Sequence, residues 1–178
     1  SKLVALGGSV FTSTDFGITW TKQTGSPSVT TVASSADGSK LIAGEHASQT
    51  PIYTSNDSGQ TWVETSSGDH GWKGVASSAD GSKLAAVSND GSVSTSADSG
   101  ATWTARNFSS DSSWSDVASS ADGTRLVAVD ASFDFEMAGH VHVSIDSGQT
   151  WAMQTGPGQR AWNAVVSSAD GNRFAAVV

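Results

Sequence analysis

The 178-residue chain is acidic, with nine Lys and Arg against seventeen Asp and Glu and a formal net charge of −8. Nucleic-acid binding depends on clustered basic side chains that neutralise phosphates, so we expect no nucleic-acid partner. No apolar run approaches the ~18 residues of a membrane span, and we expect no membrane insertion. The absence of cysteine excludes disulfides and thiol chemistry. Without an initiating Met or a leader peptide, the sequence is expected to be a mature or excised segment.

Two motifs alternate along the whole chain. The octets "STDFGITW", "SNDSGQTW", "SADSGATW" and "SIDSGQTW" occupy 13–20, 55–62, 96–103 and 144–151. Between them run "SSADGSKL" twice, "SSADGTRL" and "SSADGNRF", at 34–41, 77–84, 119–126 and 167–174. A period of about 42 residues is typical of one four-stranded blade of a β-propeller. We therefore expect an all-β β-propeller, with 1–178 forming a single repeat region of about four blades.

The expected strands follow this period from one end to the other. The chain starts at a second strand in 2–8, and one full unit spans 72–106. Its strands are predicted at 72–80, 83–87, 92–96 and 102–106, with the first two joined by an Asp-Gly hairpin turn. The chain stops at another second strand in 173–178, which gives seventeen strands. A four-bladed ring would leave one strand spare, so we expect part of a larger ring or an assembly of copies.

The octet resembles the Asp-box (BNR) repeat of sialidase-like β-propellers, S-x-D-x-G-x-T-W, and all four copies match each fixed position. The resemblance implies that the box is a turn between the third and fourth strands of a blade, away from the catalytic centre. The physical chemistry agrees, since Asp can accept turn N–H groups, Gly can adopt positive φ, and Trp can pack between layers. The expected structural residues are Asp15, Gly17, Trp20, Asp57, Gly59, Trp62, Asp98, Gly100, Trp103, Asp146, Gly148 and Trp151.

Binding residues are expected at the opposite end of the blades, where the loops differ from one repeat to the next. The candidates for ligand binding are Glu45, His46, Asp69, His70, Trp72, Trp114, Asp134, Glu136, Arg160 and Trp162. The three Trp could form an aromatic platform for sugar rings. Packing between blades is the preferred interpretation, because these Trp recur with the repeat period.

The longest loop suggests a metal site at first sight, because Asp130, Asp134 and Glu136 precede His140 and His142. Alignment of the repeats places His142 in the column of Phe11, Tyr53 and Ser94, where it can simply pack. We therefore expect no metal and no cofactor. Asn107 begins an Asn-Phe-Ser acceptor sequence for a glycan.

The catalytic residues of sialidases do not carry over. That family uses an arginine triad, a tyrosine nucleophile with a glutamate, and an acid, whereas this chain's only tyrosine, Tyr53, lies in a repeat column. We expect a non-enzymatic extracellular or cell-surface module for structural assembly or for protein or glycan recognition. Its partners would be other protein chains, copies of itself, or glycans. The alternative is a fragment of a sialidase-like or other Asp-box glycoside hydrolase.

Overall fold

The computed structural model describes residues 2–46, 49–107, 113–131 and 139–178. These residues form seventeen β-strands, and every strand pair among them is antiparallel. None of the described segments is a helix with the length and apolar character needed to cross a bilayer. The predicted all-β class is confirmed.

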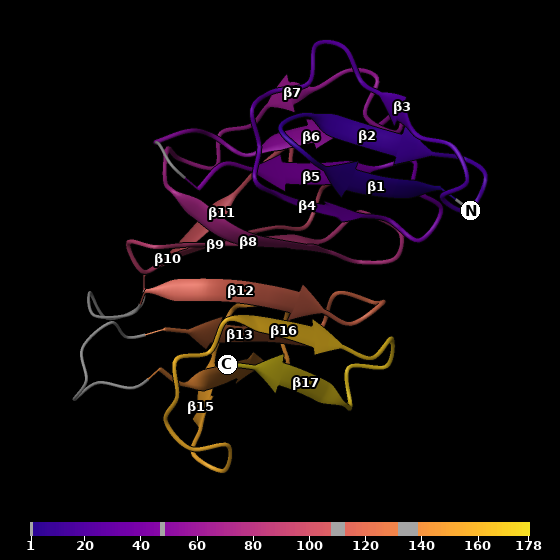
Figure 1. The fold of residues 1–178 in the computed structure, drawn as a ribbon. Helices are drawn as coiled ribbons and strands as arrows, with labels where there is room; N and C mark the ends of the chain where they lie inside the picture. The colour runs from indigo at the N-terminus through magenta and orange to yellow at the C-terminus, as the bar shows by residue number, and fades with distance from the viewer. Residues whose placement is uncertain (1, 47–48, 108–112, 132–138) are drawn as a thin grey trace.

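The strands form five sheets that follow one another along the chain, from indigo to yellow in Figure 1. The first sheet has three strands, the next three sheets have four each, and the last has two. The first is β1 (Leu3–Leu6), β2 (Val10–Ser13) and β3 (Thr21–Lys22). The second is β4 (Thr31–Ser34), β5 (Leu41–Gly44), β6 (Tyr53–Ser55) and β7 (Val63–Glu64). The third is β8 (Trp72–Ser77), β9 (Leu84–Ser88), β10 (Ser92–Ser96) and β11 (Thr104–Asn107).

The fourth sheet is β12 (Trp114–Ser119), β13 (Leu126–Asp130), β14 (Val141–Ser144) and β15 (Ala152–Gln154), and the last is β16 (Ala164–Ser167) and β17 (Phe174–Val177). Within each four-stranded sheet the strands are ordered as in the sequence, so each of these sheets is one propeller blade. The first and last sheets are not hydrogen-bonded to each other in the described residues.

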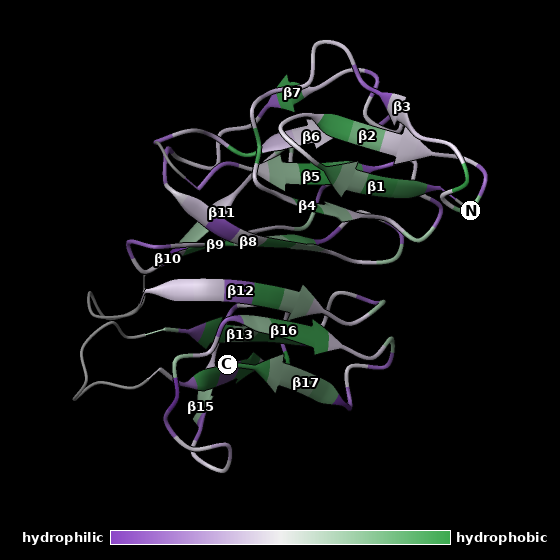
Figure 2. Cartoon of the chain, in the orientation of Figure 1, coloured by the Kyte–Doolittle hydropathy of each residue, from purple (hydrophilic) through white to green (hydrophobic). Residues whose placement is uncertain are grey.

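The second strand of each blade is buried on both faces. Every residue of β5, β9 and β13 is buried, whereas the corresponding strands of the end sheets, β1 and β17, are largely exposed or half-buried. Strands covered on both sides are nearly continuous in apolar residues. In Figure 2 the hydrophobic residues lie mainly in the strands, and much of the hydrophilic colour lies in turns and loops. β5, β9 and β13 are therefore more buried than β1 and β17 because neighbouring sheets cover the inner blades on both sides.

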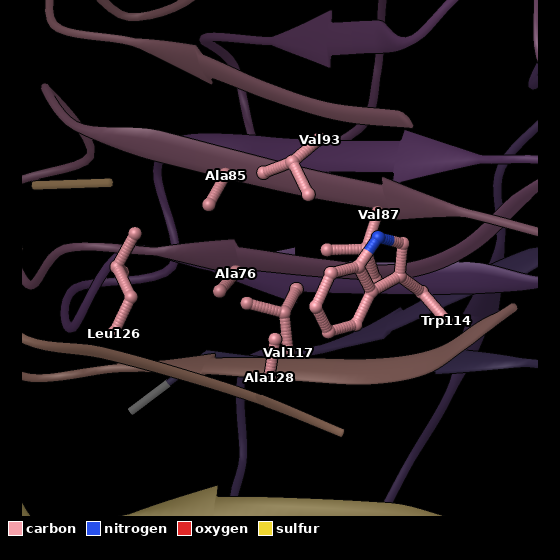
Figure 3. Packing of buried hydrophobic residues seen from close by; sticks show 8 residues of the cluster. All are labelled: Ala76, Ala85, Val87, Val93, Trp114, Val117, Leu126 and Ala128. Carbon is pink, nitrogen blue, oxygen red and sulfur yellow. The ribbon is translucent and has the colours of Figure 1, made fainter. Parts of the chain in front are cut away.

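The apolar core lies between blades rather than within one. The cluster in Figure 3 joins residues of β8, β9 and β10 to residues of β12 and β13, with Trp114 at one side. Similar clusters lie between the second and third blades and between the fourth blade and the last sheet. Burial of apolar area, at about 25 cal/mol per Å², therefore stabilises the stacking of blades.

Hydrogen bonds also link each blade to the next. The first strands β4, β8, β12 and β16 lie side by side. The Ala36 N–H donates to the Ala79 carbonyl at 2.8 Å, and the Ala79 N–H donates to the Ala121 carbonyl at 2.7 Å. The Ala121 N–H in turn donates to the Ala169 carbonyl at 2.8 Å. A fixed spacing between blades is thus built into the repeated "SSADG" segment.

Candidate functional site

Each Asp box closes on itself through hydrogen bonds. In the third blade the Ser96 hydroxyl donates to Asp98 Oδ1 at 2.8 Å, and the Gly100 N–H donates to Ser96 Oγ at 2.9 Å. The Thr102 N–H and hydroxyl donate to the two Asp98 carboxylate oxygens at 2.8 and 2.6 Å. The Trp103 indole N–H donates to the Gly100 carbonyl at 3.1 Å. The other three boxes repeat this pattern.

The carboxylates of the boxes are stabilised in the charged form. The hydroxyl and backbone N–H of Thr102 lower the pKa of Asp98 to about 2, and the equivalent threonines act in the same way in the other boxes. The box glycines have positive φ, as expected. Sequence reasoning missed a second such residue, because the position before each glycine also has a φ of 60 to 64°. The box is a strained turn whose polar groups bond to one another.

The box tryptophans pack into the core between their own blade and the preceding one. Trp62, Trp103 and Trp151 are partly buried against successive clusters. Trp20 is 43% exposed, because the described residues place no blade beside the first sheet on that side. The predicted packing role holds for three of the four Trp.

The two repeated turns share one end of each blade, as predicted. The Ser58 N–H of a box donates to the Ser39 carbonyl of the neighbouring Asp-Gly turn at 2.9 Å, with equivalent bonds in the next two blades. Lys40 reaches across to the next blade, where its Nζ lies 3.1 Å from the Ser99 hydroxyl. We call this the Asp-box end, and the end with the loops that differ between blades the variable end.

At the variable end, loops of the second and third blades bring several predicted residues together. The Trp72 N–H donates to the Glu45 carbonyl at 2.8 Å, and His70 forms a β-bridge with Thr50. The adjacent His46 and Asp69 side chains are exposed. Glu45, His46, Asp69 and His70 therefore lie near one another although they come from two loops.

His70 also pairs with a carboxylate that sequence reasoning missed. Its Nδ1 lies 2.6 Å from Asp90 Oδ2. Burial raises the pKa of Asp90, but hydrogen bonds from Ser88 and His70 outweigh this and hold it well below its usual range. Asp90 lies in the Ser-Asn-Asp-Gly turn between β9 and β10, and this Asp-Gly pair was the signal that could have identified it.

The three tryptophans proposed as a sugar platform are buried. Trp72, Trp114 and Trp162 are 0%, 1% and 8% exposed. The indole N–H of Trp72 donates to the Thr50 carbonyl at 2.8 Å, and that of Trp114 to the Gly91 carbonyl at 3.1 Å. None of the three offers an open ring face for stacking against a sugar. Their burial favours packing between blades.

A second group of residues surrounds the start of β14. The Arg160 N–H donates to the Gly139 carbonyl at 3.1 Å, and the exposed Arg160 side chain lies at this rim. Asp130, His140 and His142 each offer a ligand atom within 4.8 Å of the other two. The His142 ring also packs edge-on against Trp114, with centroids 5.0 Å apart. Asp134 and Glu136 fall outside the described residues, as do Phe108 and Ser109 of the glycan acceptor sequence that Asn107 begins.

One aspartate on a first strand lies where three sheets approach one another. Asp116 Oδ2 accepts the Val165 N–H at 3.0 Å, while Oδ1 accepts the Val117 N–H at 2.9 Å. A Cβ on Gly74 would lie 2.8 Å from Asp116 Oδ1, so the third blade approaches it closely as well. Burial raises the pKa of Asp116. Its carboxyl group serves as a hydrogen-bonded joint between blades.

Known proteins share the repeat and the fold of this chain. The family model of the BNR-Asp box repeat matches residues 10–24. No curated protein sequence matches the chain. A xyloglucanase of family GH74 from Xanthomonas campestris superposes with a TM-score of 0.71 at 16% identity, over 99% of this chain and 33% of the enzyme chain.

Two further structures are similar. A GH74 enzyme from Niastella koreensis has a TM-score of 0.71 at 20% identity, over 96% of this chain and 30% of that one. A chain in a nidogen–laminin complex superposes with a TM-score of 0.71 at 11% identity, and the match covers 99% of this chain and 69% of that one. The chain thus spans about a third of the GH74 chains. It carries Asp-box repeats and has the Asp-box β-propeller fold, and it aligns with part of each of these longer chains.

Proposed function

We propose that this chain is a non-enzymatic extracellular module that recognises other proteins through its variable end. One observation supports the proposal above others. The Asp-box end repeats from blade to blade and its polar groups bond internally, whereas the variable end differs and displays exposed side chains such as His46, Asp69 and Arg160. Recognition by loops on a rigid scaffold is a common use of such an arrangement.

A protein partner is favoured over a glycan. Sugar recognition commonly uses an exposed aromatic face, and the three tryptophans nearest the variable end are buried. The loops offer charged and polar groups instead, which suit a polar protein surface. The family resemblance supports extracellular placement, and the nidogen–laminin complex provides an example of this fold in a chain from a protein–protein complex.

A binding experiment tests the proposal by making the same change in charge at the variable end and at the Asp-box end. Binding of the chain to a panel of purified matrix proteins that includes laminin would be measured by biolayer interferometry. Asp69→Lys changes the variable end by two charges, and the double variant Asn56→Lys with Ile145→Lys does the same at the Asp-box end. Loss of at least about tenfold in affinity is expected only for Asp69→Lys. Loss only in the double variant would contradict the proposal.

We also propose that a second copy of this chain covers the last sheet in the assembled state. A groove of about 530 Å³ lies beside β16 and β17, lined by Val141, Val143, Trp162, Val165, Phe174 and Ala176. Val166 and Val177 on this two-stranded sheet are 62% and 55% exposed. A two-stranded sheet is marginal without further cover. Sedimentation would then show self-association above the 18.1 kDa monomer, and a monomer at high concentration would refute association of copies.

The second candidate is a glycoside hydrolase fragment. It is favoured by the fold similarity to the GH74 enzymes. Incubation of the chain with xyloglucan separates the two candidates. Hydrolysis of xyloglucan by the purified chain would overturn the non-enzymatic proposal.

A further inference from the structure

Three residues that could bind a metal ion occur together in the fourth blade. Asp130 stands where the other repeats have Gly7, Glu45 and Ser88, and His142 where they have Phe11, Tyr53 and Ser94. His140 stands in the column of Ser9, Pro51 and Ser92. Only the fourth repeat places a carboxylate and two histidines in these three columns.

The strand pairing brings these residues together. β13 ends at Asp130 and β14 begins at Val141, and the backbones of Asp130 and His140 are paired by the Asp130 N–H and the His140 carbonyl at 3.1 Å. His140 and His142 are two positions apart, so their rings are on the same side of this segment. The ring centroids are 6.1 Å apart.

The carboxylate is oriented and largely withdrawn from water. Asp130 is 6% exposed, and its Oδ1 accepts the backbone N–H of His140. Its Oδ2 faces His142 Nε2 at 3.4 Å. A charge-assisted hydrogen bond is usually about 2.7–2.9 Å long. Two ligand atoms bound at about 2.05 Å to a tetrahedral zinc ion are themselves about 3.4 Å apart, so the observed distance fits a pair of metal ligands.

A polar group supports the second histidine. Gln159 Nε2 lies 3.0 Å from His140 Nε2, and a half-turn of the side-chain amide places its oxygen at this position. Metal-binding histidines commonly donate the ring N–H that does not face the metal to such a group, which orients the ring. Because the two ends of an amide are assigned from the hydrogen-bond pattern, Gln159 can present its oxygen to the Nε2–H. Nδ1 of His140 then remains for the metal.

We propose that Asp130, His140 and His142 bind a divalent transition-metal ion, with zinc as the best match. Imidazole and carboxylate ligands suit zinc, and a divalent cation offsets the cost of burying a carboxylate. This proposal differs from the expectation from sequence alone that the chain binds no metal. Three protein ligands leave a fourth position, which water or a partner's side chain can fill at the variable end.

The chain contains a matched control. His70 also faces a carboxylate, Asp90, and also packs edge-on against a tryptophan, Trp72, with centroids 5.0 Å apart. It lacks a second histidine ligand among the described residues. His70→Gln therefore removes the same kind of side chain from the same kind of contact without touching the proposed site.

The test uses tag-free chain stripped with EDTA and titrated with Zn²⁺ by calorimetry. We expect one ion per chain, a loss of at least about tenfold in affinity in His140→Gln, His142→Gln and Asp130→Asn, and unchanged binding in His70→Gln. Circular dichroism confirms that each variant is folded. Co²⁺ should give the strong visible absorption of a tetrahedral site in the wild type and not in His142→Gln.

Several results would overturn the proposal. These are no Zn²⁺ binding at concentrations up to about 100 µM, an equal loss of affinity in His70→Gln, or unchanged affinity in folded His140→Gln and His142→Gln. Preference for Ca²⁺ over Zn²⁺ would also contradict it, since calcium favours oxygen ligands.

Discussion

Substitution of Trp72 tests whether the tryptophans near the variable end pack between blades or bind a ligand. Its ring is fully buried between the second and third blades, against Ile42, Ile52 and Leu84. Its indole N–H donates to the Thr50 carbonyl at 2.8 Å. Trp72→Phe removes this donor and part of the ring while keeping an aromatic side chain.

The expected cost follows from these contacts. The lost hydrogen bond contributes about 1 kcal/mol, and the lost apolar volume with its residual gap about 1–2 kcal/mol. The free energy of unfolding should fall by about 2–3 kcal/mol, and Tm by roughly 5–10 °C for a chain of this size. Trp72→Ala should cost about 3–5 kcal/mol or more.

Urea unfolding followed by fluorescence measures both variants. The control is Trp20→Phe, which removes an equivalent indole hydrogen bond, to the Gly17 carbonyl at 3.1 Å, from a ring that is 43% exposed. Its cost should be below about 1 kcal/mol. Equal costs for the Trp72 and Trp20 variants, or a Trp72→Phe variant of wild-type stability, would refute the packing account.

Three further predictions concern turns and joints. Gly44→Ala should lower the free energy of unfolding by about 1–3 kcal/mol, because the new Cβ would lie 2.8 Å from Trp72 Cβ. Wild-type stability in urea would show that the second and third blades can move apart enough to admit a methyl group at no cost. Asp116→Ala should cost about 1–2 kcal/mol by leaving the Val165 N–H without its acceptor, and Asp116→Asn, which can still accept this bond, should recover part of the loss. The box aspartates have pKa values of about 2 instead of 3.8, so the stability they contribute is complete above about pH 4 and is lost as the pH falls towards 2. A urea midpoint that stays constant from pH 5 to about pH 2 would contradict this assignment.

Much of the fold could be predicted from the sequence because its determinants are local. The predicted strands at 92–96 and 72–80 correspond to β10 (Ser92–Ser96) and β8 (Trp72–Ser77). The fourth strand was predicted at 102–106 but runs from Thr104 to Asn107, because Thr102 and Trp103 still belong to the box turn through their hydrogen bonds.

The candidate site was less predictable, since it depends on contacts between separate segments. The pairing of His70 with Asp90 joins residues twenty positions apart through two loops. Asp130 was grouped with the histidines by the sequence, but repeat alignment favoured simple packing of His142. Only the register of β13 against β14 placed Asp130 Oδ2 at 3.4 Å from His142 Nε2.

The sequence by itself determined the repeat, the strand order and the chemistry of the turns. The hydrogen bonds made by the first serine, the aspartate and the tryptophan side chains of an Asp box lie within its eight-residue motif, so its four copies specify four similar turns wherever the blades are placed. The tertiary structure decided which aromatic rings are covered and which ionisable groups meet. Those outcomes depend on the neighbouring blade, because Trp72 is buried by contacts from the second blade and Trp20 is exposed where the described residues place no blade beside it.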